Sequence, residues 1–131
     1  MEFILNNYNN LLSEIEKIIK EGQREIEERV HYEKITMSWK IGKIISDNLK
    51  GERELDYGNK VLQNLEGDTG ITKRTLYRMC SFYKSYPTLP SKEASLKLSH
   101  YQILSVLQDG EQRKYFEKLT IENGLSARDL Q

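Results

Sequence analysis

Apolar residues recur every three or four positions along most of this chain, the spacing that gathers them on one face of an α-helix. The first such segment covers residues 8–30, where charged residues occupy most of the other positions. Packing on the rest of the domain is the simpler interpretation of its apolar stripe. A coiled-coil seam has the same pattern, so self-association through this helix is the alternative. The stripe consists of Tyr8, Leu11, Leu12, Ile15, Ile18, Ile19, Gly22, Ile26 and Val30.

A second apolar segment follows at residues 34–49, with no Gly or Pro between the two, so one continuous helix can contain both. Its apolar positions form two adjacent stripes, which is typical of a helix at the centre of a core. Trp39 is the largest anchor there, Gly42 leaves room for another helix to approach, and Gly51 is suited to end the helix. The stripes consist of Ile35, Trp39, Gly42, Ile45 and Leu49, and of Met37, Ile41, Ile44 and Asn48.

The next stretch predicts two helices joined by a turn. The first helix covers residues 54–66, and residues 67–70, Gly-Asp-Thr-Gly, form the turn. Thr72 is suited to cap the second helix, which ends before Pro87 because the residue preceding a proline is pushed out of the α region. The expected buried residues are Leu55, Val61, Leu62 and Leu65 in the first helix, and Leu76, Met79, Cys80 and Tyr83 in the second.

The opposite face of the second helix is basic, hydroxyl-bearing and aromatic. A helix of this kind, set by a tight turn against a shorter one, is what helix-turn-helix proteins place in the major groove of DNA. An ordinary solvated surface would have the same composition, and this stretch alone does not separate the two interpretations. We predict a helix-turn-helix at residues 55–86, with DNA-binding residues Thr72, Lys73, Arg74, Tyr77, Arg78, Ser81 and Lys84.

The last third of the chain predicts three more helices after a connector that contains Pro90. Ser99 is suited to cap the first of them and Gly110 to end it. Gly124 is suited to end the second, at residues 111–123, and Ser126 with Asp129 forms a capping-box pattern for the third. A helix that has barely begun when the chain stops indicates a piece of a longer protein. The expected inward residues are Ile103, Leu104, Leu107, Tyr115, Phe116, Leu119 and Thr120.

These segments predict an all-α fold of six or seven helices and no strand. Residues 1–50 form a long N-terminal helix or helical pair, and residues 51–131 form the helix-turn-helix and a compact bundle of C-terminal helices. The chain of 131 residues suits one structural unit that buries its own core.

Composition adds three constraints. The single cysteine, Cys80, excludes an intramolecular disulfide and is expected to be a small core residue. The sequence has no apolar run of membrane-spanning length and no signal-peptide pattern, so we expect a cytoplasmic protein with no membrane partner. Net charge is zero, but residues 1–33 hold eight acidic and four basic residues, whereas residues 72–101 hold one acidic and six basic. The positive charge is therefore concentrated at the predicted DNA-binding helix.

Residues that could carry catalysis or bind a metal are sparse. His31, His100 and Cys80 lack zinc-ligand spacing, and structural or surface roles suit the two histidines. The sequence has no phosphate-binding loop and no nucleophile elbow. Glu52, Glu54 and Asp56 match solvated acids at a helix start. We therefore expect no catalytic residue, metal, cofactor or small-molecule substrate, and no enzymatic activity in this chain alone.

Several short pieces, taken in order, resemble the N-terminal domain of the YhcG family over about residues 8–131. That resemblance implies a helix-turn-helix module placed before a PD-(D/E)xK-type nuclease domain, which is missing here, so the nuclease activity is not carried over. Residues 98–130 are also similar to the helices that follow the helix-turn-helix of ParB-like partition proteins. The matching pieces are Trp39-Lys40-Ile41-Gly42, Tyr57-Gly58, Gly70-Ile71-Thr72 with Leu76 and Met79, Phe82-Tyr83, Tyr86-Pro87, Leu98-Ser99-His100-Tyr101, Arg113-Lys114-Tyr115-Phe116 and Leu125-Ser126-Ala127-Arg128-Asp129-Leu130.

Two departures from the family pattern affect local packing. The family usually has a longer insert before the glycine at position 70, which here is cut to residues 66–69. It often has a tryptophan where Leu125 stands and another near Leu98.

Two functions remain open at this point. One is binding of double-stranded DNA, with arginines and lysines holding phosphates and Arg74 or Arg78 reaching guanine edges. The other is a protein-interaction or dimerisation module without DNA binding, with a homodimer formed through the N-terminal helix. The salt dependence of duplex binding separates them, because phosphate contacts weaken steeply as salt rises.

Overall fold

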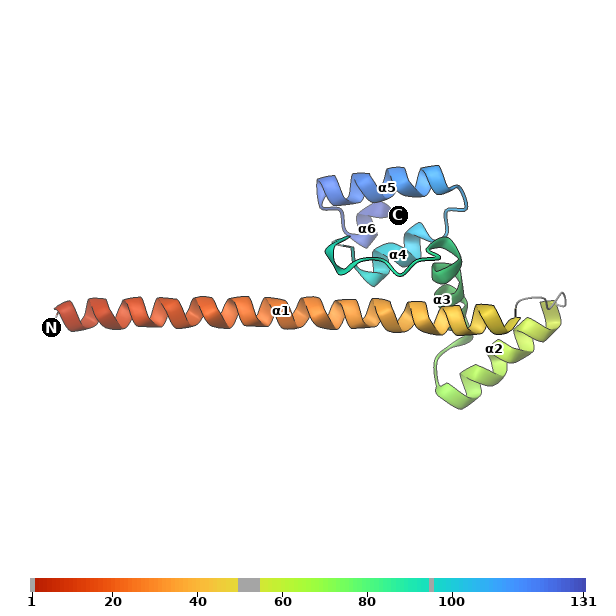
Figure 1. Cartoon of the computed structure of the whole chain (residues 1–131), viewed down its shortest axis with the longest axis horizontal. Helices are drawn as coiled ribbons and strands as arrows, with labels where there is room; N and C mark the ends of the chain where they lie inside the picture. Colours follow the sequence, from red (N-terminus) through yellow and green to blue (C-terminus); the bar gives the residue numbers. More distant parts are fainter. Residues whose placement is uncertain (1, 50–54, 95) are drawn as a thin grey trace.

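The computed structural model of the chain describes residues 2–49, 55–94 and 96–131, although the side chains of residues 2–5 and 55–57 lie outside that description. Within these ranges every regular element is helical, which confirms the predicted all-α class. One long helix crosses the molecule, and the others gather on its C-terminal part (Figure 1). None of the described helices is long and apolar enough to cross a membrane.

Helix α1, Glu2–Leu49, is continuous through both N-terminal segments predicted from the sequence. Its first part extends away from the compact part of the molecule (Figure 1). Residues 6–31, which we call the arm, are exposed throughout except for the half-buried Gly22. The expectation that the apolar stripe of residues 8–30 packs on the rest of the domain is therefore wrong, because none of the other helices that the structure describes lies along the arm (Figure 1).

The remainder of α1 forms one wall of the core. Ile35 and Ile45 are buried, and Trp39 packs against the core while its Nε1 donates a hydrogen bond to the Tyr86 carbonyl at 2.7 Å. Met37 and Ile44, from the second predicted stripe, are instead exposed, because only one side of α1 meets the other helices. We call residues 32–49 together with the later helices the head.

Helices α2, Leu55–Thr69, and α3, Lys73–Ser85, are joined by a short turn with Gly70 at φ +79°. The predicted turn at residues 67–70 was placed too early, since α2 continues through Thr69, whose hydroxyl donates to the Leu65 carbonyl. Thr72 caps α3 as expected, its Oγ1 accepting from the Thr75 N–H at 3.2 Å. Of the expected buried residues of α2, Leu62 is buried and Leu65 packs against the core. The side chain of Leu55 and the expected stop at Gly51 lie outside what the structure describes.

Two buried clusters meet along α3. The first joins Ile45 of α1, Leu62 of α2 and Leu76, Met79 and Cys80 of α3. The second joins α1 and α3 to α4 and the segment before it, through Ile35, Phe82, Leu96, Tyr101 and Leu104. Because α3 lies between α1 and α4, its buried arc is wider than the predicted stripe. Phe82, which that stripe omitted, is the most buried residue of the helix, whereas Tyr83 is only half-buried.

The C-terminal elements follow the sequence closely, with corrected ends. A short 3₁₀ turn, η1 (Lys92–Ala94), precedes α4 (Leu98–Leu104), whose cap is Lys97 and not Ser99. Gly110 begins α5 (Gly110–Asn123) instead of ending α4, since Asp109 caps it by accepting from the Glu111 N–H.

The last two helix ends match their predictions. Gly124 ends α5 at φ +60°, and Ser126 with Asp129 forms the expected capping box of α6 (Ala127–Leu130). Within α5, Thr120 is buried, but Tyr115 was wrongly expected inside, being 62% exposed.

Candidate nucleic-acid interface

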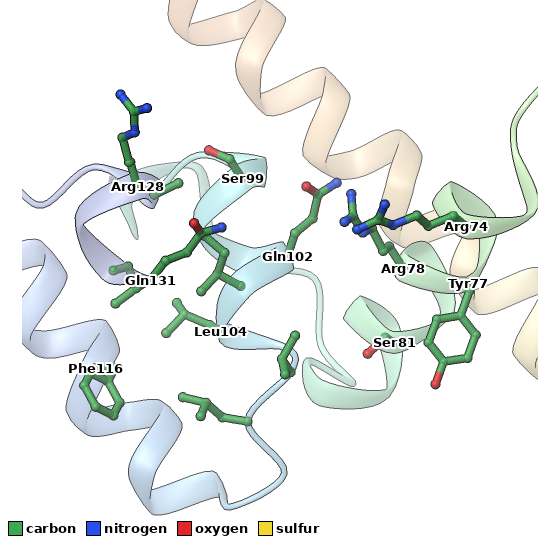
Figure 2. Close-up of a pocket in the computed structure, with 15 residues that line it drawn as sticks. Arg74, Tyr77, Arg78, Ser81, Ser99, Gln102, Leu104, Phe116, Arg128 and Gln131 are labelled. Carbon is green, nitrogen blue, oxygen red and sulfur yellow. The ribbon is translucent and has the colours of Figure 1, made fainter.

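A groove of about 870 Å³ runs between α3, α4 and the C-terminal helices (Figure 2). Helix α3 forms one wall with Arg74, Tyr77, Arg78 and Ser81, all of them predicted DNA-binding residues. Four of the seven residues predicted to bind DNA therefore lie on one surface of the folded molecule.

The two arginines of this wall are positioned by the helix that carries them. Arg74 and Arg78 are four residues apart, so they project from the same face of α3. Leu76 and Met79 hold the opposite face in the core, which leaves both guanidinium groups exposed. In Figure 2 the two side chains extend from α3 toward Gln102 of α4, and Tyr77, which is 66% exposed, points away from them.

Three of the predicted residues lie away from the groove. Thr72 is occupied with capping α3, and its hydroxyl also donates to Thr75 Oγ1 at 2.8 Å. Lys73 begins the helix, where its backbone N–H donates to the Glu66 carboxylate at 2.9 Å. Lys84 is exposed near the other end of α3 and is absent from the groove lining. These three residues can add positive charge or a helix cap, but they do not line the groove.

The opposite side of the groove was not identified from the sequence. It is supplied by Ser99 and Gln102 of α4 and by Arg128 and Gln131 at the end of the chain. Arg128 lies in the capping-box turn of α6, and only the packing of α6 near α4 brings it to the same groove as Arg74. The sequence signal for α6 was its cap, which says nothing about the position of the helix in space.

The lining combines positively charged and apolar side chains. It contains three arginines, and no acidic residue is among the described side chains that line it. Ile103, Leu107 and Phe116 are among its apolar residues. Positive charge concentrated on a lining without acidic side chains attracts anionic ligands such as phosphate. In the part of the chain that the structure describes, no group of histidine, cysteine or acidic side chains is arranged to hold a metal ion.

Buried polar groups behind the groove hold its helices in place. His100 lies in α4, where its Nδ1 accepts from the Lys97 N–H at 3.0 Å and its Nε2 donates to the Leu125 carbonyl at 2.8 Å. This ring connects α4 to the loop that precedes α6. The histidine therefore has the structural role that was expected of it.

Arg113 of α5 makes a comparable connection. Its guanidinium donates to the carbonyls of Ser85, Leu104 and Leu107, and it lies 5.7 Å from the centre of the Tyr86 ring. It thereby satisfies carbonyls at the C-terminal ends of α3 and α4, where helices lack internal partners. Sequence reasoning gave Arg113 no role of its own, because a single arginine on an amphipathic helix has no distinctive pattern.

Three side chains in the core beneath the groove have pKa values above their ordinary range. Burial raises the pKa of the Cys80 thiol, as expected of a core cysteine. Burial, followed by the nearby Glu117 carboxylate, raises the pKa of Tyr101 to about 12. Burial also raises the pKa of Tyr86, whose hydroxyl donates to Glu117 Oε1 at 2.9 Å.

Comparison with known families identifies the chain at the level of its domain. Residues 14–131 match the family described as the DUF1016 N-terminal domain. The chain belongs to this family. The family is YhcG-like, so that part of the resemblance drawn from the sequence is confirmed. Searches of curated proteins and of solved structures found no match.

Proposed function

We propose that this DUF1016 N-terminal domain binds double-stranded DNA through the arginine-bearing wall of the groove. The observation that carries the proposal is the set of three arginines, Arg74, Arg78 and Arg128, on one groove whose described lining has no acidic residue. Arginine suits this task because its planar guanidinium binds phosphate in a bidentate manner and also reads guanine in the major groove.

The arrangement of α2 and α3 supports a helix-turn-helix mode of binding. The two helices pack on each other across a short glycine-containing turn, and α3 exposes Arg74, Tyr77 and Arg78 along its N-terminal half. In helix-turn-helix proteins the N-terminal residues of the second helix contact base edges. We therefore assign the base-reading position to Arg74 or Arg78, and phosphate contacts to the other arginine of this pair and to Arg128, Lys73 and Lys84.

The resemblance to the YhcG family extends the proposal to a biological role. In that family the domain precedes a PD-(D/E)xK-type nuclease domain. A DNA-binding module in this place would deliver the nuclease to its target or regulate its access. On this proposal the chain itself positions DNA and performs no cleavage.

Reversing the charge of the α3 wall tests the proposal. The variant Arg74→Glu/Arg78→Glu changes two exposed side chains, so the free energy of unfolding is expected to change by only about 0.5 kcal/mol per site. Duplex affinity should fall by several kcal/mol, since each arginine–base pairing is worth about 1–3 kcal/mol. The salt dependence of duplex binding should also become shallower, by about one unit for each phosphate that the variant no longer neutralises.

The matched control is Lys17→Glu/Lys20→Glu on the arm, which makes the same charge change far from the groove and should leave duplex binding nearly unaltered. A folded Arg74→Glu/Arg78→Glu protein that binds duplex as tightly as the parent chain would exclude α3 as the reading element. The second candidate function, a protein-interaction module without DNA binding, would then lead. The apolar part of the groove lining, with Ile103, Leu107 and Phe116, is the observation that favours it.

A further inference from the structure

An apolar stripe on α1 remains exposed from the arm into the head. The side chains of its members are between 39% and 65% exposed. The stripe continues beyond the arm into the part of α1 in which Ile35 and Ile45, on another side of the helix, are buried. We call it the exposed stripe; it consists of Tyr8, Leu12, Ile15, Ile19, Ile26, Val30, Met37 and Ile44. In the described part of the chain, no other helix lies along the arm (Figure 1).

Helix geometry places these residues on one straight line. Tyr8, Ile26 and Ile44 are spaced 18 residues apart, which is about five full turns of an α-helix. At about 100° per residue, the other members lie within about 40° of the same line. Ile35 and Gly42, which face the head, lie about 160–180° away from it. A partner helix on the exposed stripe would therefore lie on the side of α1 opposite Ile35 and Gly42.

The positions on this line are symmetric about Ile26. Gly22, Glu33 and Lys40 occupy the remaining positions on the line. With them included, the spacings between successive positions, each three or four residues, have the same order whether counted from Tyr8 or from Ile44. An antiparallel copy centred on Ile26 keeps its register over the whole length, which is about 54 Å. It sets Tyr8 against Ile44, Leu12 against Lys40, Ile15 against Met37, Ile19 against Glu33, Gly22 against Val30, and Ile26 against itself.

Charges along the stripe favour this antiparallel arrangement over a parallel one. A parallel pair in register would set Glu33 against Glu33 and Lys40 against Lys40 of the second copy. The antiparallel pair sets both against aliphatic residues, over which the long stem of Lys40 can lie while its charge stays in water. On the flanks it brings Glu16 near Lys34 of the second copy, whereas a parallel pair brings Arg29 near Lys34.

We propose that a second copy of this chain covers the exposed stripe, forming an antiparallel two-helix coiled coil centred on Ile26. A helix gains most of its stability from tertiary packing of its apolar face. The second copy supplies that packing to an arm that has none from the residues that the structure describes. The interface is isologous, since the same surface of each copy is used, and it closes at a dimer. It does not depend on the DNA-binding proposal, because the stripe and the groove share no residue.

Light scattering and a pair of cysteine variants test the dimer and its direction. The parent chain should have twice the monomer mass of 15.4 kDa, and Ile19→Glu/Ile26→Glu should have the monomer mass. Lys17→Glu/Lys20→Glu, on the other faces of the arm, should remain a dimer. Under mild oxidation, a mixture of Ile15→Cys and Met37→Cys chains should form a mixed disulfide, and Ile15→Cys alone should form none. Cys80 is buried and serves as an unreactive background.

Three results would overturn the proposal. A parent chain that is monomeric at high concentration removes the second copy as the occupant. A disulfide between two Ile15→Cys chains, with no mixed disulfide between Ile15→Cys and Met37→Cys chains, would show that the coiled coil is parallel. A dimeric Ile19→Glu/Ile26→Glu variant with a folded head, which Trp39 fluorescence reports, would place the interface elsewhere. A parent chain that dimerises but does not bind duplex would contradict only the proposed function.

Discussion

At Gly42 the backbone of α1 lies against the backbone of α3. A Cβ added there would collide with the backbone carbonyl of Met79. Backbone atoms of a packed helix cannot rotate away as a side chain can, so the two helices would have to separate. The sequence-based expectation that Gly42 admits a close helix is confirmed, and this position decides how deeply α3 is seated.

We therefore expect Gly42→Ala to destabilise the head. Overpacking typically costs about 1–3 kcal/mol, and the better helix propensity of alanine, about 1 kcal/mol, offsets only part of it. Gly67→Ala is the matched control, because Gly67 lies in α2 with nothing within 4 Å of an added Cβ. Urea unfolding should show a lower midpoint for the first variant and an unchanged or higher one for the second. A raised midpoint for Gly42→Ala would contradict the close approach.

At the scale of elements, α3 serves two surfaces at once. Its buried arc contacts α1 and α2 on one side and α4 on the other, while its remaining face forms a wall of the groove. The aromatic residues Phe82, Tyr86 and Tyr101 join the C-terminal half of α3 to α4, with ring centres 5.1–5.6 Å apart. Any change that loosens this aromatic contact should also shift the groove residues that α3 and α4 carry.

The alkaline stability of the protein reports on this aromatic contact. The pKa of Tyr101 is raised to about 12 in the folded chain, against about 10 when unfolded, so the folded state holds the proton more tightly. This contribution is fully present below about pH 10 and is lost as pH rises toward about 12, with a slope of about 1.4 kcal/mol per pH unit. The raised pKa of Tyr86 acts in the same direction.

Urea unfolding measured at about pH 8 and about pH 11 should therefore show a marked loss of stability. Tyr101→Phe should reduce this loss, because phenylalanine cannot ionise. Tyr115→Phe, which changes an exposed ring of α5, is the matched control and should leave the loss unaltered. Equal pH dependence in the parent chain and Tyr101→Phe would show that other groups carry the alkaline transition.

At the scale of the whole molecule, the chain divides into a head with two buried clusters and an arm outside them. The first contacts of α1 with the head come from Tyr32, whose hydroxyl donates to the Pro90 carbonyl at 3.2 Å, and from Ile35. None of the described side chains before them, those of residues 6–31, belongs to either cluster. The groove also lies wholly within the head.

Removal of residues 1–30 should therefore leave the head folded. Its free energy of unfolding should change by no more than about 0.5 kcal/mol, the usual range for changes away from packed features. The shortened chain should also bind duplex DNA as one head of the parent chain does, and it should have the mass of a monomer. Thermal unfolding and light scattering measure the two outcomes. Loss of cooperative unfolding in the shortened chain would show that the arm contributes to the fold of the head.

The sequence by itself determined the helices, most of their caps and the face of α3 that carries the arginines. These are local properties, since the spacing of apolar residues, the Thr72 and Ser126 caps and the Gly124 stop act within one or two turns of backbone. Some ends were misplaced, as at Gly67–Gly70, Ser99 and Gly110, because a glycine or serine is compatible with more than one helix position.

Only the tertiary structure decided which apolar faces are covered. The stripe of the arm and that of the core segment look alike in sequence, yet one is exposed and the other buried, because burial depends on which helices fold back onto α1. The same holds for the groove, whose far side comes from Gln102 and Arg128, brought to α3 by the packing of α4 and α6. Contacts between residues so distant along the chain leave no periodic signal, so their placement follows from the packing of the whole head.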